Sequence, residues 1–188
     1  MSDLKGELRL LYEELNSQDP DVKKDALKKT IVYMSVGRDV SPIFQTVIRC
    51  LEINDIEMKK LIYLYIINYS QSRPKDAIMV INQFCRDVDK KINNKPLIRA
   101  LAFRTMGCLR VKELNEYLIN PLNDGLKDPN SYVRKTAVMC VPKMYEITPE
   151  LVDRADMINT LKDIFEKDGN TQVVANCVQA LIELSQLR

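Results

Sequence analysis

The chain has 188 residues, 46% of them hydrophobic, and its 28 basic and 26 acidic side chains leave a net charge of +2. This composition supports an ample core, and 5 glycines and 8 prolines exclude a collagen-like or low-complexity chain. The five cysteines form no CxxC pair and histidine is absent, which argues against a zinc site and a disulfide framework. We therefore expect free cysteines, a reducing cytosolic compartment, and no metal or cofactor.

The predicted elements are all helices. Proline near a first turn marks helix starts, because its missing N–H has no helical partner there, and Asp55 is a predicted N-cap. Between these signals apolar residues recur at steps of three to four, and no alternating strand pattern is found. In chain order, the predicted helices are 3–16, 20–36, 42–52, 56–70, 74–88, 96–110, 113–126, 130–146, 149–166 (broken) and 170–186.

A short pattern recurs five times along the chain. An apolar residue is usually followed by a basic one, and a small or apolar residue stands four places after the first. The copies begin 36, 40, 35 and 40 residues apart, at Val22, Met58, Ile98, Val133 and Val173. A helical period near 40 indicates an α-solenoid of the HEAT or armadillo kind, in which antiparallel helix pairs stack. We expect an all-α superhelix, a single domain over 1–188 with about five repeats, belonging to a longer solenoid.

The pattern is interpreted as a packing device and not a binding site. Its basic member follows a buried apolar position, so we expect the aliphatic stem to cover apolar surface while the charge stays in water. The residue four places on shares the same helix face and is small in three copies, which allows close helix approach. The run Tyr63, Tyr65 and Tyr69 is likewise predicted to pack in the core.

Charge is uneven along the chain. Residues 61–135 carry 13 basic and 7 acidic side chains, an excess of +6. This excess fits an acidic partner or an anionic membrane, or an ordinary solvated surface. The net charge of the whole chain is close to zero, which does not favour nucleic-acid binding. The sequence contains no apolar run of 18 residues, so no membrane span is predicted. Residues 1–6 lack the apolar centre of a signal peptide.

Catalytic patterns are missing. Without histidine no serine or cysteine triad can be assembled, and the chain has no glycine-rich phosphate loop and no HExxH motif. The carboxylates are scattered over predicted helix surfaces, where nothing desolvates a pair for general acid–base work. The sequence therefore predicts a protein that is not an enzyme.

Several long blocks resemble the β-adaptins. Residues 59–69, KKLIYLYIINY, are similar to the β-adaptin segment KKLVYLYLxNYA, and residues 96–110, PLIRALAFRTMGCLR, are similar to PLIRALAVRTMGCIR. Residues 34–40, 131–137 and 173–176 match further blocks. The resemblance runs from about Lys5 to the end of the chain. The loop from Lys90 to Lys95 departs from it by roughly three extra residues.

The resemblance implies a function. β-Adaptins are large subunits of heterotetrameric adaptor complexes that link cargo and membrane to clathrin. The chain would be the N-terminal part of the trunk of a non-enzymatic β subunit, which scaffolds coat assembly in vesicle-mediated transport. Its implied partners are a second large, a medium and a small adaptin, and clathrin through regions absent from this chain. The implied location is cytoplasmic and peripheral, on Golgi or endosomal coated vesicles or plasma-membrane coated pits.

Two sites are carried over from the resemblance. In some β-adaptins the helix matching 74–88 helps to bind an activated Arf-type GTPase, and Ile78 and Ile81 occupy matching positions. Their spacing of three predicts one helix face, with packing inside the solenoid as the alternative. In other members basic residues of the first repeat contact phosphoinositides, and Lys28 and Lys29 match two of them. Here residues 18–21, QDPD, stand where relatives are lysine-rich.

Two other readings share the helical repeat. One is a large subunit of the coatomer type, a more distant relative of the adaptins. The other is a generic HEAT-repeat scaffold, such as a transport receptor or a phosphatase scaffold. Neither accounts for the YLY and RTMGC blocks. The particular adaptor complex is left open by the sequence.

Overall fold

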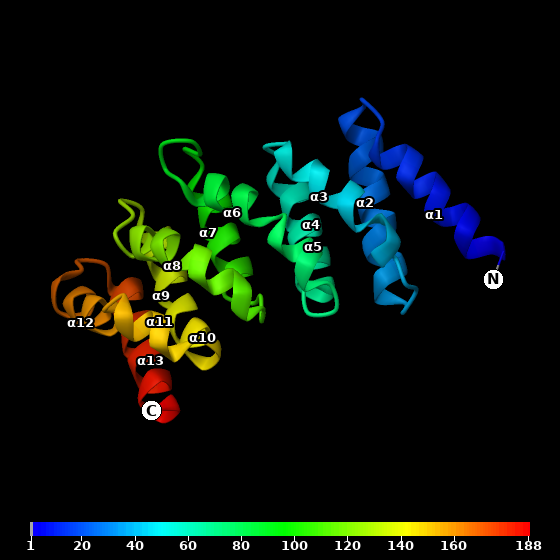
Figure 1. Cartoon of the computed structure of the whole chain (residues 1–188). Coiled ribbons are helices and arrows are strands. Elements are labelled where there is room, and N and C mark those ends of the chain that lie inside the picture. Colours follow the sequence, from blue (N-terminus) through cyan, green and yellow to red (C-terminus); the bar gives the residue numbers. More distant parts are fainter. Residues whose placement is uncertain (1) are drawn as a thin grey trace. The chain divides into compact units, whose positions relative to one another are not determined.

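The computed structural model describes the backbone of residues 2–188 and the side chains from Lys5 onward, and within them every regular element is a helix (Figure 1). The chain divides into two compact units, residues 1–80 and 81–188. The all-α prediction is confirmed. The single domain of about five repeats stays a prediction.

The described part of the first unit contains five α-helices and two 3-10 turns. Helix α1 packs against α2, to which a short turn joins it, and α2 packs in turn against α4. An ion pair between Lys24 and Glu57 links α2 to α4. The elements are α1 (Ser2–Leu15), α2 (Pro20–Ser35), η1 (Ser41–Ile43), α3 (Phe44–Arg49), η2 (Cys50–Glu52), α4 (Ile56–Tyr69) and α5 (Pro74–Ile78).

The second unit contains eight α-helices. Helices α7, α9 and α13 are successive neighbours, and α6, α8 and α12 pair with them. The bounds are α6 (Ile81–Val88), α7 (Pro96–Met106), α8 (Lys112–Leu126), α9 (Ser131–Val138), α10 (Cys140–Ile147), α11 (Pro149–Arg154), α12 (Met157–Lys167) and α13 (Thr171–Leu187).

Side-chain caps fix several helix starts. Asp55 Oδ1 accepts the Met58 N–H at 2.8 Å, so its predicted role as an N-cap is confirmed. Asn130 and Asn170 cap α9 and α13 in the same way. Proline opens α2, α5, α7 and α11.

Several predicted helices are divided in the structure. The segment predicted as one helix over 42–52 consists of η1, α3 and η2, and the break predicted within 149–166 is confirmed between α11 and α12. The helix predicted over 130–146 divides at Met139 into α9 and α10. Pro142 explains this break, because it has no N–H to donate to the carbonyl of Val138. The helix predicted over 74–88 divides after Ile78, where Met79 and Val80 donate to carbonyls only three residues back before α6 begins.

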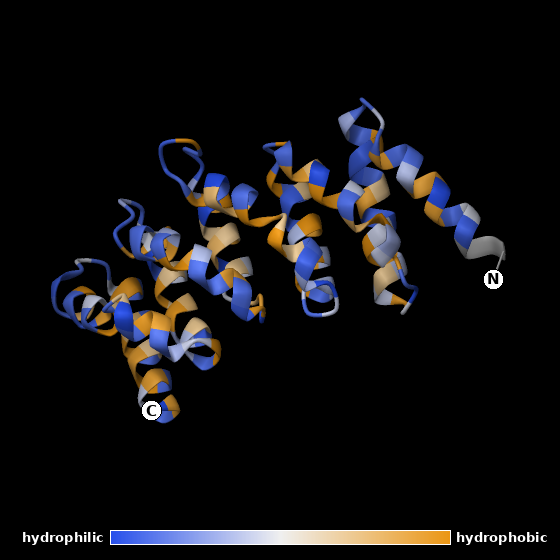
Figure 2. Cartoon of the chain, viewed as in Figure 1, coloured by the Kyte–Doolittle hydropathy of each residue, from blue (hydrophilic) through white to orange (hydrophobic). Residues whose placement is uncertain are grey.

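The core follows the repeat pattern. The small or apolar residue four places after each leading position is fully buried in all five copies (Ala26, Ile62, Ala102, Ala137 and Cys177). Four of the leading residues are buried as well, whereas Val22 is 37% exposed. Figure 2 shows hydrophobic and hydrophilic residues alternating along the helices.

The tyrosine run of α4 packs as predicted. Tyr63 and Tyr65 are almost completely buried, and Tyr65 contacts the ring of Phe44. The Tyr65 hydroxyl donates to the carbonyl of Val40 at 2.7 Å, and burial raises the pKa of this phenol. Tyr69 holds the same residue, since its hydroxyl accepts the Val40 N–H. Tyr65 and Tyr69 therefore fix the segment between α2 and η1.

Candidate functional surfaces

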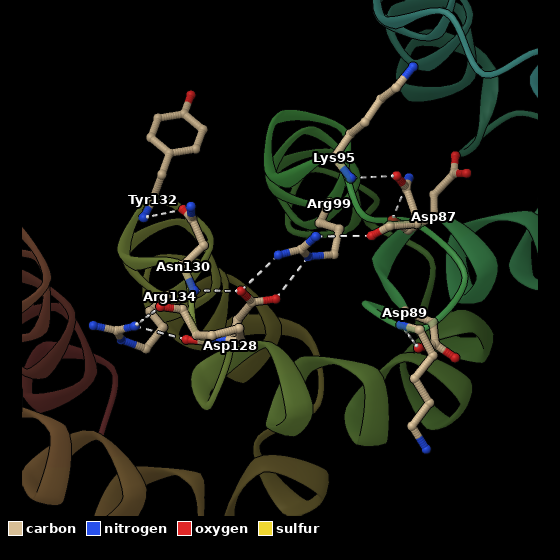
Figure 3. Close-up of polar contacts among 11 residues, drawn as sticks. Asp87, Asp89, Lys95, Arg99, Asp128, Asn130, Tyr132 and Arg134 are labelled. Carbon is tan, nitrogen blue, oxygen red and sulfur yellow. Dashed lines mark hydrogen bonds and ion pairs between the residues drawn. The ribbon is translucent and has the colours of Figure 1, made fainter.

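A buried polar ladder joins successive turns of the second unit (Figure 3). Arg99, on α7, donates from Nε and Nη2 to the two carboxylate oxygens of Asp128, both at 2.9 Å. Its third donor, Nη1, reaches back to the carbonyl of Asn93 at 2.9 Å. Both side chains of the pair are only 4% exposed. Arg99 therefore ties the turn before its own helix to the turn that precedes α9.

The next arginine repeats this geometry. Arg134, on α9, donates from Nε and Nη2 to Asp168 at 2.7 and 3.0 Å, and from Nη1 to the carbonyl of Asp128 at 2.8 Å. Hydrogen bonds from Arg134 hold the pKa of Asp168 below its usual range. Val174 occupies the corresponding position on α13, so the series of cations ends there.

The ladder corrects one prediction. The charge of the basic pattern residue was expected to stay in water, but in three copies it points inward. Arg99 and Arg134 bind carboxylates, and Lys59 is 1% exposed with its Nζ 2.8 Å from the carbonyl of Leu51. Lys23 and Arg134 keep partly exposed side chains, although Arg134 binds Asp168. Burial is tolerated because each cation finds a carboxylate or a carbonyl partner.

The partner residues were missed by the sequence analysis. Asp128 and Asp168 lie 29 and 34 residues after the arginines they bind, in the following turn. The sequence spacing held a signal for these sites. In both copies the arginine donates to the backbone carbonyl of the residue six places before it, Asn93 for Arg99 and Asp128 for Arg134. The repeated turn, an Asp followed two residues later by a capping Asn, also marks these sites.

The two expected GTPase-binding residues differ in their surroundings. Ile78 is the last residue of α5 and is 42% exposed, whereas Ile81 is the first residue of α6 and is 7% exposed. The prediction that one helix face carries both is wrong, because the helix breaks at the two intervening residues. Their role in binding a GTPase stays a prediction.

The two expected phosphoinositide lysines are exposed on α2 and already ion-paired. Lys28 Nζ lies 3.2 Å from Asp25, and Lys29 Nζ lies 2.8 Å from Glu14 on α1. Each pair is open to solvent and can exchange for another anion at little cost. Their role in binding a headgroup stays a prediction as well.

The surface hollows carry no recognisable catalytic set. One hollow, of about 570 Å³, lies in the second unit between α6, the loop after it and α8, and mixes three lysines with three aspartates. Among the residues the structure describes, no group of three or more Cys, Asp or Glu side chains is placed to hold a metal ion. No described helix is long and apolar enough to cross a membrane.

The cysteines are free in the described structure. Cys50, Cys140 and Cys177 are buried, and Cys85 and Cys108 are partly exposed. Burial raises the pKa of Cys140 to about 12, and its Sγ lies 2.9 Å from the carbonyl of Phe103. The three buried thiols therefore pack as small core groups.

Stacked helix pairs joined by a buried ladder place this chain in the class of HEAT/armadillo-type α-solenoids. Known folds agree. A designed armadillo repeat protein superposes with a TM-score of 0.68 at 18% identity, covering 95% of this chain and 82% of the design. A homology model of the full-length AP-3 complex gives 0.67 at 22% identity, covering 92% of this chain and 28% of that one. At such identities these likenesses concern the fold alone.

Sequence comparison narrows the class to a family. Residues 5–188 match the adaptin N terminal region, and the chain belongs to this family. It is 48% identical over 183 residues to the AP-1 complex subunit beta of Dictyostelium discoideum and 48% identical over 182 residues to AP-1 complex subunit beta-1 of Homo sapiens. Identity to the Saccharomyces cerevisiae AP-1 complex subunit beta-1 is 42% over 183 residues. Each alignment covers 97% of this chain, but only 19% of the first two relatives and 25% of the third.

Proposed function

We propose that the chain is the N-terminal trunk segment of the β subunit of a heterotetrameric adaptor complex and scaffolds coat assembly in vesicle-mediated transport. The observation that carries the proposal is the 48% identity to subunits named AP-1 complex beta, sustained over 97% of the chain. The fold is consistent with it, because a helical-repeat stack presents extended surfaces to macromolecular partners.

The proposed role is non-enzymatic. Cytoplasmic partners would be the other large adaptin, a medium and a small subunit, assembled peripherally on coated membranes. Clathrin would be reached through parts of the subunit outside this chain. The relatives' names specify the AP-1 complex, so we propose membership of that complex before others.

Affinity purification tests this assignment. The full-length product is tagged in its native cells, and co-purifying proteins are identified by mass spectrometry, with untagged cells as the control. We expect one large, one medium and one small adaptin in comparable amounts. Recovery of coatomer subunits would transfer the chain to the other coat, and recovery of neither set would refute a role in coats.

An Arf-type GTPase is a further proposed partner, with Ile78 as its contact. Its exposed side chain at the end of α5 offers the apolar surface that a partner would cover. We expect Ile78→Asp to weaken retention of the GTP-loaded GTPase without changing thermal stability. The matched control is Ile182→Asp, an equally exposed isoleucine on α13. Equal losses in both variants would contradict a specific site.

A phosphoinositide contact at Lys28 and Lys29 completes the proposal. It is supported by their exposure and by the weakness of their present ion pairs. Replacement of both by glutamine is expected to reduce binding to phosphoinositide-containing vesicles. Unchanged binding in this variant would remove the two lysines from the membrane surface.

A further inference from the structure

The loop between α6 and α7 combines charge with one exposed apolar side chain. Residues 89–95 read DKKINNK, with three lysines, one aspartate and a single apolar residue. That residue, Ile92, is 61% exposed, and Lys90 and Lys91 beside it are exposed too. Figure 1 shows this loop projecting beyond the helices it joins, and Figure 2 shows it as hydrophilic with a hydrophobic tip.

The base of this loop is rigidly held. Asn93 is 5% exposed, and its Nδ2 donates to the carbonyl of Asp87 while its Oδ1 accepts the Lys95 N–H at 3.0 Å. The carbonyl of Asn93 is also the acceptor of Arg99 in the ladder. On the other side, Asp89 Oδ1 accepts the Lys91 N–H at 2.7 Å. The exposure of Ile92 is therefore set by an anchored backbone, which holds the side chain out in solvent.

The two lysines at the tip, Lys90 and Lys91, are available for an external anion. Among the described side chains, no ion pair joins Lys90 or Lys91 to a carboxylate. Residues 89–95 together carry +2. The hollow behind the loop is unsuited to a free anion, because Asp89, Asp124 and Asp128 line it beside the lysines. Lys90 and Lys91 lie at the edge of this hollow and remain exposed to solvent, so an extended anionic surface can reach them without entering it.

We propose that residues 89–95 form a membrane-contact loop, in which Lys90 and Lys91 face anionic headgroups and Ile92 enters the boundary of the acyl chains. An aliphatic tip flanked by long cationic side chains suits a bilayer interface, where apolar and ionic attraction act together. A protein partner would need a far larger apolar area than one isoleucine provides. This proposal rests on the proposed function only because a coat subunit works beside a membrane.

Vesicle co-sedimentation of the chain tests the ionic part. We expect binding to phosphatidylserine/phosphatidylcholine vesicles, little binding to phosphatidylcholine alone, and weakening as salt is raised. Lys90→Gln with Lys91→Gln should reduce the partition coefficient by about 25-fold, roughly fivefold for each lysine. The matched control is Lys60→Gln with Lys75→Gln, the same loss of charge at two exposed lysines of the other unit to which no site is assigned. A loss of binding in the control pair alone would overturn the proposal.

Tryptophan fluorescence tests insertion of the tip. The chain has no tryptophan, so Ile92→Trp introduces a single reporter. We expect a blue shift of its emission on phosphatidylserine vesicles and quenching by brominated acyl chains. Tyr117→Trp, at an exposed position on α8, is the control and should show neither. Unshifted emission from the Ile92→Trp variant on vesicles that bind it would overturn insertion, as would equal shifts in both variants.

Two further measurements separate the alternatives. The first is retention of the chain on an immobilised acidic peptide. If the chain binds this peptide but not the vesicles, and the Lys90→Gln/Lys91→Gln variant loses peptide binding, the loop is a protein-docking site and the lipid assignment is refuted. The loop variants should still co-purify with the other adaptins, because the loop lies outside the helix packing. Failure of co-purification in the unmodified chain would count against the proposed function, whereas failure of vesicle binding alone counts against the loop.

Discussion

A glycine-to-alanine pair tests the packing of the second unit most directly. Gly125 lies within α8, directly against the ring of Phe103 on α7. A Cβ placed on it would lie 2.7 Å from Cε2 and 2.8 Å from Cε1 of that ring, and closer still to Cζ. Gly6, within α1, has no atom within 4 Å of the same added carbon. The same substitution should therefore have opposite effects at the two positions.

The magnitudes follow from two competing terms. Alanine in place of glycine inside a helix gains about 0.5–1 kcal/mol, because the unfolded chain loses freedom. At Gly6 nothing opposes this gain. At Gly125 the carbon would be about 1 Å closer to the ring than normal carbon contacts allow, and overpacking of this kind costs about 1–3 kcal/mol. We expect Gly6→Ala to raise the free energy of unfolding by about 0.5–1 kcal/mol. We expect Gly125→Ala to lower it by about 1–2 kcal/mol.

Urea unfolding followed by circular dichroism measures both changes. Phe103→Val in the Gly125→Ala background supplies the internal test, since the smaller side chain removes the clash. The β-adaptin segment that residues 96–110 resemble has valine at the position of Phe103, so the helix backbone accepts it. The double variant should recover part of the loss. Stabilisation by Gly125→Ala as large as that by Gly6→Ala would show that the Phe103 ring moves aside freely, and would refute this reasoning.

Three further predictions concern buried groups. Arg99→Met and Asp128→Asn should each lower the free energy of unfolding by about 3–5 kcal/mol, with the double variant costing less than the sum, as a double-mutant cycle in urea would show. Because its folded-state pKa is depressed, Asp168 adds stability above its unfolded pKa of about 3.9 and loses it at lower pH. The stability gap between the unmodified chain and Arg134→Met should therefore narrow as pH falls from 6 to 3, and a constant gap would contradict the pairing. Ile81→Asp should melt several degrees lower, because the buried site has no partner for a carboxylate, and unchanged melting would show that the site is accessible.

The helices and most of the core could be predicted because their signals are local. Apolar spacing, proline at first turns and the cap at Asp55 act within one or two turns of helix. The breaks were harder to predict. Pro142 was visible in the sequence, but its effect appears three residues earlier, at Met139. No comparable residue marks the division after Ile78, which separated two positions that the spacing had placed on one face.

The candidate surfaces were less predictable because exposure depends on distant neighbours. Spacing placed Ile78 and Ile81 together, yet one is half-exposed and the other buried. The loop of residues 89–95 stood out in the sequence only as extra length. Its character comes from Asn93, whose buried side chain anchors the base and leaves Ile92 exposed. The sequence showed that residues 61–135 carry an excess of positive charge. Only the fold showed that two of these lysines flank an exposed isoleucine at the tip of one loop.

The ladder shows why a local pattern could not decide between a solvated cation and a buried one. A long side chain beside a buried position can run outward along the surface or inward to a carboxylate, and the pattern around Arg99 is the same in both cases. The deciding residue is Asp128, which is contributed by the following turn. An arginine buried without that partner would be costly, so neighbouring helix pairs can stack only in the register that brings the two together. The ladder therefore specifies how repeats align, and it does so through residues that no single repeat contains.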